Sequence, residues 1–163
     1  MKKIFSLLVV LFCATSLVSA QMNDKQVWKE AKKTAKIMEK QGWILKSPGS
    51  LEMVLYSYMD SMNGGKYCSV VNEATAPMIS IAENQAMIYA MESAVQQTVA
   101  IVAESGRQQL SPNARYSVDN LNYALRHSFT ILKHEQGGHT TCRVYFLLDK
   151  EAAKRCNVVA VSE

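Results

Sequence analysis

The sequence has few of the residue patterns that mark catalytic chemistry. Its 163 residues include four cysteines and three histidines, and no two cysteines form a CxxC pair, which disfavours a thiol-redox enzyme. No G-x-S-x-G elbow is present. The segment Asn63-Gly64-Gly65-Lys66 lacks both the first glycine and the Ser or Thr of a phosphate-binding loop. We therefore expect no catalytic residues, no cofactor and a role that is not enzymatic.

The sequence also offers no convincing metal site. His134, His139 and Cys142 lie close together in the chain and are of metal-ligating types. They fall in a predicted β-hairpin, where His134 and Cys142 should project to opposite faces. Zinc needs converging ligands, so we predict no metal site.

Charge of one sign and long apolar runs are both scarce. The formal net charge of +4 falls to +2 once Lys2 and Lys3 are removed, which is too small to indicate nucleic-acid binding. After residue 20, no stretch is apolar enough to predict a membrane span.

The N-terminus has the pattern of a cleaved signal peptide. Lys2 and Lys3 precede the apolar run Ile4 to Phe12, and Val18-Ser19-Ala20 matches a small-residue cleavage site. Removing residues 1–20 from 163 leaves 143, which suits a single domain, 21–163. Phe precedes Cys13, so lipidation there is not expected. We predict an exported protein, periplasmic or associated with the outer membrane.

Three cysteines remain after cleavage, and export permits a disulfide. Cys68 and Cys142 both fall on apolar rows of predicted strands, so they are the pair we expect if one forms. Three unpaired thiols, Cys156 included, are the open alternative.

One long helix, Ile79 to Ala103, organises the predicted fold. Pro77 lies just ahead of it and Gly106 just after it, as helix boundaries require. Apolar residues recur at helical spacing, so we expect them to face the core. These residues are Ile81, Ile88, Val95 and Val102, with Met87, Met91, Ala94 and Ile101 beside them.

The first helix, from Asn23 or Asp24 to about Gln41, is predicted to be strongly basic on its outer side. Val27, Ala31 and Ala35 mark its inner side. The basic residues indicate a surface for anionic lipid or glycan, although a solvated helix face is the simpler interpretation. They are Lys25, Lys29, Lys32, Lys33, Lys36 and Lys40.

The other segments complete an α+β fold, a small and mainly antiparallel sheet of three or four strands packed on the long helix with flanking helices. The expected segments are an extended Trp43 to Leu45, a helix Leu51 to Met62, a strand Lys66 to Ala76, a helix Ser111 to Leu125, a hairpin Arg126 to Leu148 and, from Asp149 to Cys156, a short last helix or a continuation of the edge strand.

Gly137-Gly138 indicates a two-residue turn in that hairpin. This turn would place Phe129 opposite Phe146, with both side chains on the long helix. His134, Arg143 and Tyr145 would then share the other side, as a face for a ligand or partner.

Several stretches resemble small exported proteins of unassigned function from Bacteroides-type bacteria. They are Ala31 to Trp43 (AKKTAKIMEKQGW), Pro48-Gly49 with Leu51-Glu52, Tyr67 to Val95, and the hairpin end RVYFLLDKEAAKR. More distantly, the layout resembles small envelope lipoproteins of the Helicobacter type. The resemblance implies export, and it implies O-glycosylation at Ser61, because Asp60-Ser61-Met62 fits the acceptor pattern of this bacterial group.

These observations together predict a non-enzymatic interaction module of the periplasm or envelope. The expected partner is an envelope protein or a glycan. A domain that binds a small ligand or glycan is the alternative.

Overall fold

The computed structural model describes residues 21–111 and 114–161, so the predicted signal peptide and Pro112 lie outside the described residues. The elements are helices α2 (Asp24–Lys40), α3 (Leu51–Asn63), α4 (Ile79–Glu104), α5 (Leu121–Ala124) and α6 (Lys150–Ala153), and strands β1 (Trp43–Leu45), β2 (Tyr67–Ala76), β3 (Arg115–Asp119), β4 (Leu125–His134), β5 (Thr140–Asp149) and β6 (Asn157–Val161).

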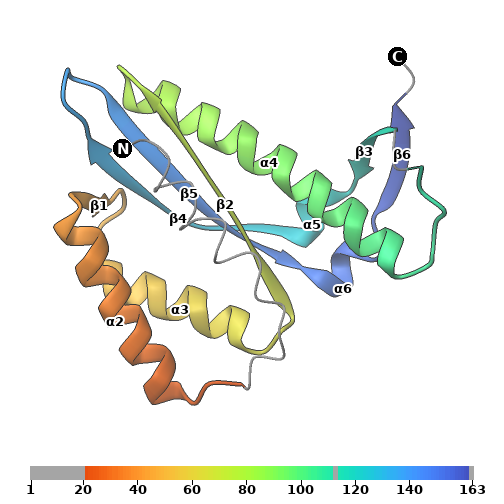
Figure 1. Cartoon of the computed structure of the whole chain (residues 1–163), viewed down its shortest axis with the longest axis horizontal. Coiled ribbons are helices and arrows are strands. Elements are labelled where there is room, and N and C mark those ends of the chain that lie inside the picture. Colours follow the sequence, from red (N-terminus) through yellow and green to blue (C-terminus); the bar gives the residue numbers. More distant parts are fainter. Residues whose placement is uncertain (1–20, 112–113, 162–163) are drawn as a thin grey trace.

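The fold has three layers around one antiparallel sheet, which confirms the predicted α+β class (Figure 1). The strand order is β1-β4-β5-β2. Helix α4 covers one face of the sheet, and α2 and α3 lie on the other. A separate ribbon of β3 and β6 lies near the C-terminal end of α4.

Strand β5 is buried on both faces because it lies inside the sheet with helices on either side. Its residues Val144, Phe146 and Leu148 join the core under α4. Tyr145 and Leu147 alternate with them and join the core under α2 and α3. This double burial accounts for the nearly unbroken apolar run in the sequence.

Helix α4 has nearly the predicted bounds, and its predicted inner side is confirmed only in part: Ala94 and Val102 are buried, and Met87, Val95 and Ile101 pack against the core. Its inner row consists of small residues four apart and is fully or almost fully buried. Three of the large residues predicted to lie inside are outside instead: Ile81, Ile88 and Met91 are 43%, 57% and 41% exposed. The inner row is Ala82, Ala86, Ala90, Ala94, Thr98 and Val102.

Small residues form the inner row of α4 because the sheet leaves little volume at the interface between helix and sheet. The sheet already supplies Val70, Phe146 and Leu148 to the interface, and alanine lets the helix backbone lie close to them. A row four residues apart is also inclined by about 26° to the helix axis, which suits a twisted sheet.

Two side-chain hydrogen bonds connect α4 with β2. Asn72 lies on the apolar side of β2, and its amide donates to the Ser93 hydroxyl at 2.8 Å. The Gln97 amide donates to the Ser69 carbonyl at 3.2 Å. Asn72 can lie on this apolar side because its amide has a hydrogen-bond partner there.

Helix α2 starts as the sequence predicts. Asn23 accepts a hydrogen bond from the Gln26 backbone N–H, and the Gln26 side chain accepts one from Asn23 in return. This reciprocal cap satisfies two of the free N–H groups at the helix start. At the other end, Gly42 has φ +85, a conformation that glycine adopts at little cost.

The hairpin exists, but its predicted turn is wrong by one residue. Gln136 joins Gly137 and Gly138 in a three-residue loop, closed by the Glu135 N–H bonded to the His139 carbonyl. Phe129 therefore pairs with Tyr145 instead of Phe146. A one-residue slip exchanges the two faces, so Phe129 and its neighbour Ile131 pack under α2 and α3.

The predicted helix from Ser111 to Leu125 is also wrong. Residues Arg115–Asp119 form strand β3, which pairs with β6. Only Leu121–Ala124 is helical, and β4 begins at Leu125. The side chains alternate between partly buried and exposed along β3, a period of two that the helical interpretation overlooked. Among the described residues, no helix is long and apolar enough to cross a membrane.

The alanine row gives a direct test of this packing. Ala90→Leu should lower the free energy of unfolding by about 1–3 kcal/mol, because the larger side chain has no room against the sheet. Ile88→Ala removes a larger but exposed side chain and should change it by less than about 1 kcal/mol. Urea denaturation measures both, and a greater loss for Ile88→Ala would show that the orientation is wrong.

Candidate interaction surfaces

The outer side of α4 carries an exposed apolar row. We define this outer row as Ile81, Ile88 and Met91, whose exposed fractions are 43%, 57% and 41%. Asn84 lies between the first two and is also exposed. The spacing of Ile81, Asn84, Ile88 and Met91 alternates three and four residues, as in helices that pack lengthwise on another helix. Large exposed apolar side chains on one row mark an interaction surface.

A second surface, on the opposite side of the sheet, is basic. All six lysines predicted on the first helix are exposed on α2. Only weak ion pairs are described for them, from Lys32 to Glu52 at 3.9 Å and from Lys33 to Glu30 at 4.0 Å. The predicted exposure of this basic surface is confirmed, and what it binds is untested.

The predicted face of His134, Arg143 and Tyr145 does not form. His134 pairs with Thr140, and its ring Nδ1 lies 3.2 Å from the Thr140 hydroxyl. Arg143 is three residues further along β5, so it projects to the opposite face from Thr140 and His134. The one-residue error in the turn produced this mistaken grouping.

Arg143 and Tyr145 do lie together, under α2 and α3. The Arg143 guanidinium lies 4.4 Å from the Trp43 ring centre and forms an ion pair with Glu73 at 2.6 Å. Burial works against the charged form of Arg143, but Tyr145 and Glu73 outweigh it and raise its pKa. For Tyr145, burial favours the neutral hydroxyl and therefore raises its pKa. With its charge paired and its ring contact made, this group stabilises the fold and leaves little for a ligand.

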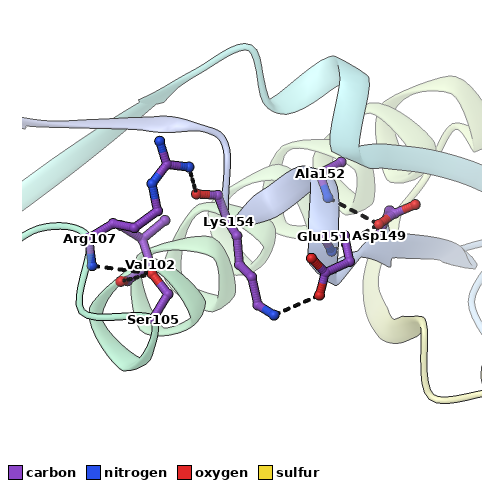
Figure 2. A network of polar contacts seen from close by, with 7 residues as sticks. All are labelled: Val102, Ser105, Arg107, Asp149, Glu151, Ala152 and Lys154. Carbon is purple, nitrogen blue, oxygen red and sulfur yellow. Dashed lines mark hydrogen bonds and ion pairs between the residues drawn. The ribbon is translucent and has the colours of Figure 1, made fainter.

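An open cleft of about 710 Å³ lies at the C-terminal end of α4, beside the start of β2 and α6. Figure 2 shows the polar network on one of its sides, where Arg107 donates to the Lys154 carbonyl and Lys154 pairs with Glu151 at 2.6 Å. Four cations and two carboxylates line the cleft, so it favours anions. The charged residues are Lys66, Arg107, Lys150, Lys154, Glu104 and Glu151.

The cations of the cleft are positioned by the turn between β5 and α6. Asp149 accepts from the backbone N–H groups of Glu151 and Ala152, as a helix cap does, and pairs with Lys66 at 3.2 Å. Burial would raise the pKa of Asp149, but the Ala152 N–H and the Lys66 ammonium hold it below its usual value. The hydrogen bond to Asp149 in turn raises the pKa of Lys66.

The proposed Cys68–Cys142 disulfide is wrong. Cys68 pairs with Leu148 across the β2–β5 ladder, and Cys142 pairs with Ala74. Six residues of strand separate Cys68 from Ala74, roughly 20 Å, whereas a disulfide needs Cα atoms within about 7 Å. No disulfide joins Cys68, Cys142 and Cys156 to one another. Burial raises the pKa of Cys142 and of Cys156, which disfavours the reactive thiolate.

Ser61 lies on α3, half-buried, and its hydroxyl donates to the Ser57 carbonyl at 2.8 Å. Nothing in the structure tests its modification, so O-glycosylation there stays a prediction. A sugar on Ser61 would first require this hydrogen bond to break.

Comparisons with family models, curated proteins and solved structures find no match to this chain. Within residues 21–111 and 114–161, no three His, Cys, Asp or Glu side chains are placed to hold a metal ion together. The function must therefore be argued from the surfaces of this structure.

Sequence reasoning missed two of these features. The cleft joins Lys66 to Lys150 and Lys154, which are distant in the chain and meet only through the β2–β5 pairing. The outer row was recognised as apolar but assigned to the core. Its alternative was readable in the alanines at positions 82, 86, 90 and 94, a continuous small row four residues apart.

His127 lies on β4 and is partly exposed, and we expect its titration to contribute to the pH dependence of stability. Its ring packs edge-on to Phe146 at 5.1 Å, and its Nε2 lies 3.0 Å from the Thr130 hydroxyl. Burial lowers its pKa, with Glu83 opposing and Lys46 assisting. The unfolded chain therefore takes up the proton first as the pH falls.

We expect the free energy of unfolding to fall as the pH drops below about 6.5, through the window between the unfolded and the lower folded pKa of His127. His127→Gln should remove this part of the pH dependence. Urea denaturation between about pH 7.5 and pH 5.5 compares the two proteins. Identical slopes in that window would show that His127 does not contribute.

Proposed function

We propose that this protein is a non-enzymatic interaction module of the bacterial envelope, exported and then held in the periplasm or at the outer membrane. The observation that carries the proposal is the outer row of α4, where isoleucines and a methionine face outward while alanines face the sheet. Export rests on the signal-peptide pattern and on the resemblance to exported Bacteroides-type proteins.

The outer row suits a protein partner that presents a helix. It lies on a helix of 26 residues that contains no lysine or arginine, and it extends over the residues from Ile81 to Met91. Burying its three side chains against an apolar partner would contribute several kcal/mol, at about 25 cal/mol per Å² of apolar surface. Exposed Tyr89 beside the row, at 45%, adds an aromatic side chain of the kind enriched in interfaces.

A second candidate function is the binding of a small anionic ligand, such as a phosphorylated or carboxylated sugar. The cleft lined by Lys66, Arg107 and Lys150 favours it. The Lys66 ammonium is engaged by Asp149, whereas no ion pair is described for Arg107 or Lys150. These two side chains would bind the anion.

The proposal that the outer row binds a protein partner is tested by replacing Ile88 with a photo-crosslinking amino acid in the native cells. A covalent adduct with one reproducible partner is expected after illumination. Met53 on α3 is the matched control, because it is 55% exposed and Ile88 is 57% exposed. Equal yields of crosslinked product from both positions, or no product from position 88, would contradict the proposal.

The binding of a small anionic ligand in the cleft is tested by titration calorimetry with glucose 6-phosphate and with glucuronate. Saturable binding should weaken at least tenfold in the double variant Arg107→Ala, Lys150→Ala, at roughly 1.5–3 kcal/mol for each lost bond to a charged group. Arg115→Ala, an exposed cation outside the cleft, should bind as the wild type does. An equal loss of affinity in Arg115→Ala would show that binding depends on the net charge of the protein and not on the cleft.

A further inference from the structure

The positive charge of the chain is concentrated on α2. This helix has six lysines and three acidic residues, a net charge of +3, whereas the chain from residue 21 onward carries +2. Without Glu163, which lies outside the described residues, residues 21–161 carry +3, so the described protein outside α2 has no net charge and the basic character belongs to one helix.

On α2, the lysines occupy one narrow strip, which we call the lysine face. At 100° per residue, Lys25, Lys29, Lys32, Lys33, Lys36 and Lys40 fall within about 100° of the circumference, opposite the buried Val27 and Ala31. The strip is about 22 Å long from Lys25 to Lys40. None of the acidic residues of α2, Asp24, Glu30 and Glu39, lies inside it.

This arrangement costs the helix stability, which a merely solvated face would not. Four lysine pairs are spaced four residues apart, for example Lys25 with Lys29 and Lys32 with Lys36, and like charges at that spacing repel. A solvated face more often alternates Glu with Lys and gains from each pair. The capping box at Asn23 and the buried apolar side offset the repulsion.

The shape of the lysine face points to an extended anionic surface. Neither the cleft at the end of α4 nor the smaller one beside Cys156 is lined by a residue of α2, so the strip lies outside both clefts, along the exposed side of a helix. Two apolar residues flank it: Trp28 on one side is 36% exposed and Ile37 on the other is 47% exposed. Such flanks can enter the interfacial layer of a bilayer while lysines contact the headgroups.

We propose that the lysine face binds the surface of an anionic lipid bilayer, through contacts between lysine ammonium groups and lipid phosphates. Helix α2 lies in the layer away from α4 (Figure 1). The bound protein would therefore present the outer row of α4 away from the membrane. The proposal stands independently of what that row contacts.

The test is co-sedimentation of the full exported chain with vesicles of phosphatidylglycerol and phosphatidylcholine, against vesicles of phosphatidylcholine alone. Binding is expected only to the anionic vesicles. It should weaken as salt rises, because the screening length falls from about 10 Å at 0.1 M to about 3 Å at 1 M.

The decisive variant is the double change Lys29→Glu, Lys36→Glu, at the centre of the strip. Vesicle binding should fall at least about 25-fold, at about fivefold for each lysine removed. Each new glutamate gains lysine neighbours at helical spacing, so the helix should remain folded, which circular dichroism checks. Lys29→Arg, Lys36→Arg should keep binding.

The matched control is Arg115→Glu, Arg126→Glu, which alters two exposed cations on β3 and β4 and gives the same net charge. It should bind anionic vesicles as the wild type does. An equal loss in this control would overturn the proposal, because binding would then follow net charge. So would wild-type binding to soluble alginate but not to vesicles, which would assign the lysine face to an acidic glycan.

Discussion

Close contact between the small residues of α4 and the sheet is the constraint on which the rest of this structure depends. Four alanines, Thr98 and Val102 occupy the interface, and all are almost completely buried. Beside this row, Met87, Val95 and Ile101 are only partly buried against the same core. On the far side of the helix, Ile81, Ile88 and Met91 are exposed. The same contact therefore builds the core and places isoleucine and methionine in the solvent.

The opposite face of the sheet uses a different solution. There, the core contains a stack of aromatic rings, with Phe129 and Tyr145 parallel at 4.2 Å and Tyr58 edge-on to both. The Tyr58 hydroxyl lies 2.6 Å from the Ser69 hydroxyl and 3.2 Å from the Phe146 carbonyl oxygen, so its polar end has hydrogen-bond partners inside the core. Helices α2 and α3 thus lie on a bulky layer, whereas α4 lies on a close-fitting one.

The sequence predicted the bounds of α2, α3, α4 and the strands of the larger sheet well because their signals are local, whereas it missed β3 and β6. Pro77 and Gly106 mark the ends of α4, and Asn23 with Gln26 marks the start of α2. The prediction from sequence failed where contacts between residues distant in the chain determine the structure. The face of α4 depends on the volume that β2 and β5 supply, and the register of the hairpin depends on whether Gln136 joins the turn.

The same distinction applies to the candidate sites. The lysines of α2 were predictable as a surface because a single helix carries them all. The grouping of His134, Arg143 and Tyr145 failed because it required a correct register between two strands. The basic cleft could not be foreseen, since Lys66 reaches Lys150 and Lys154 only through pairing of distant strands.

The pairing of β2 with β5 has a consequence for how the chain must assemble. Its partners lie roughly 60 to 80 residues apart in the sequence, with α4 and the β3 segment between them, so the contact order of this sheet is high. Until β5 is in place, the alanine row of α4 has little of the surface that it packs on. The N-terminal half therefore emerges during synthesis without its own complete core, and folding of the domain waits for the last strands to be made.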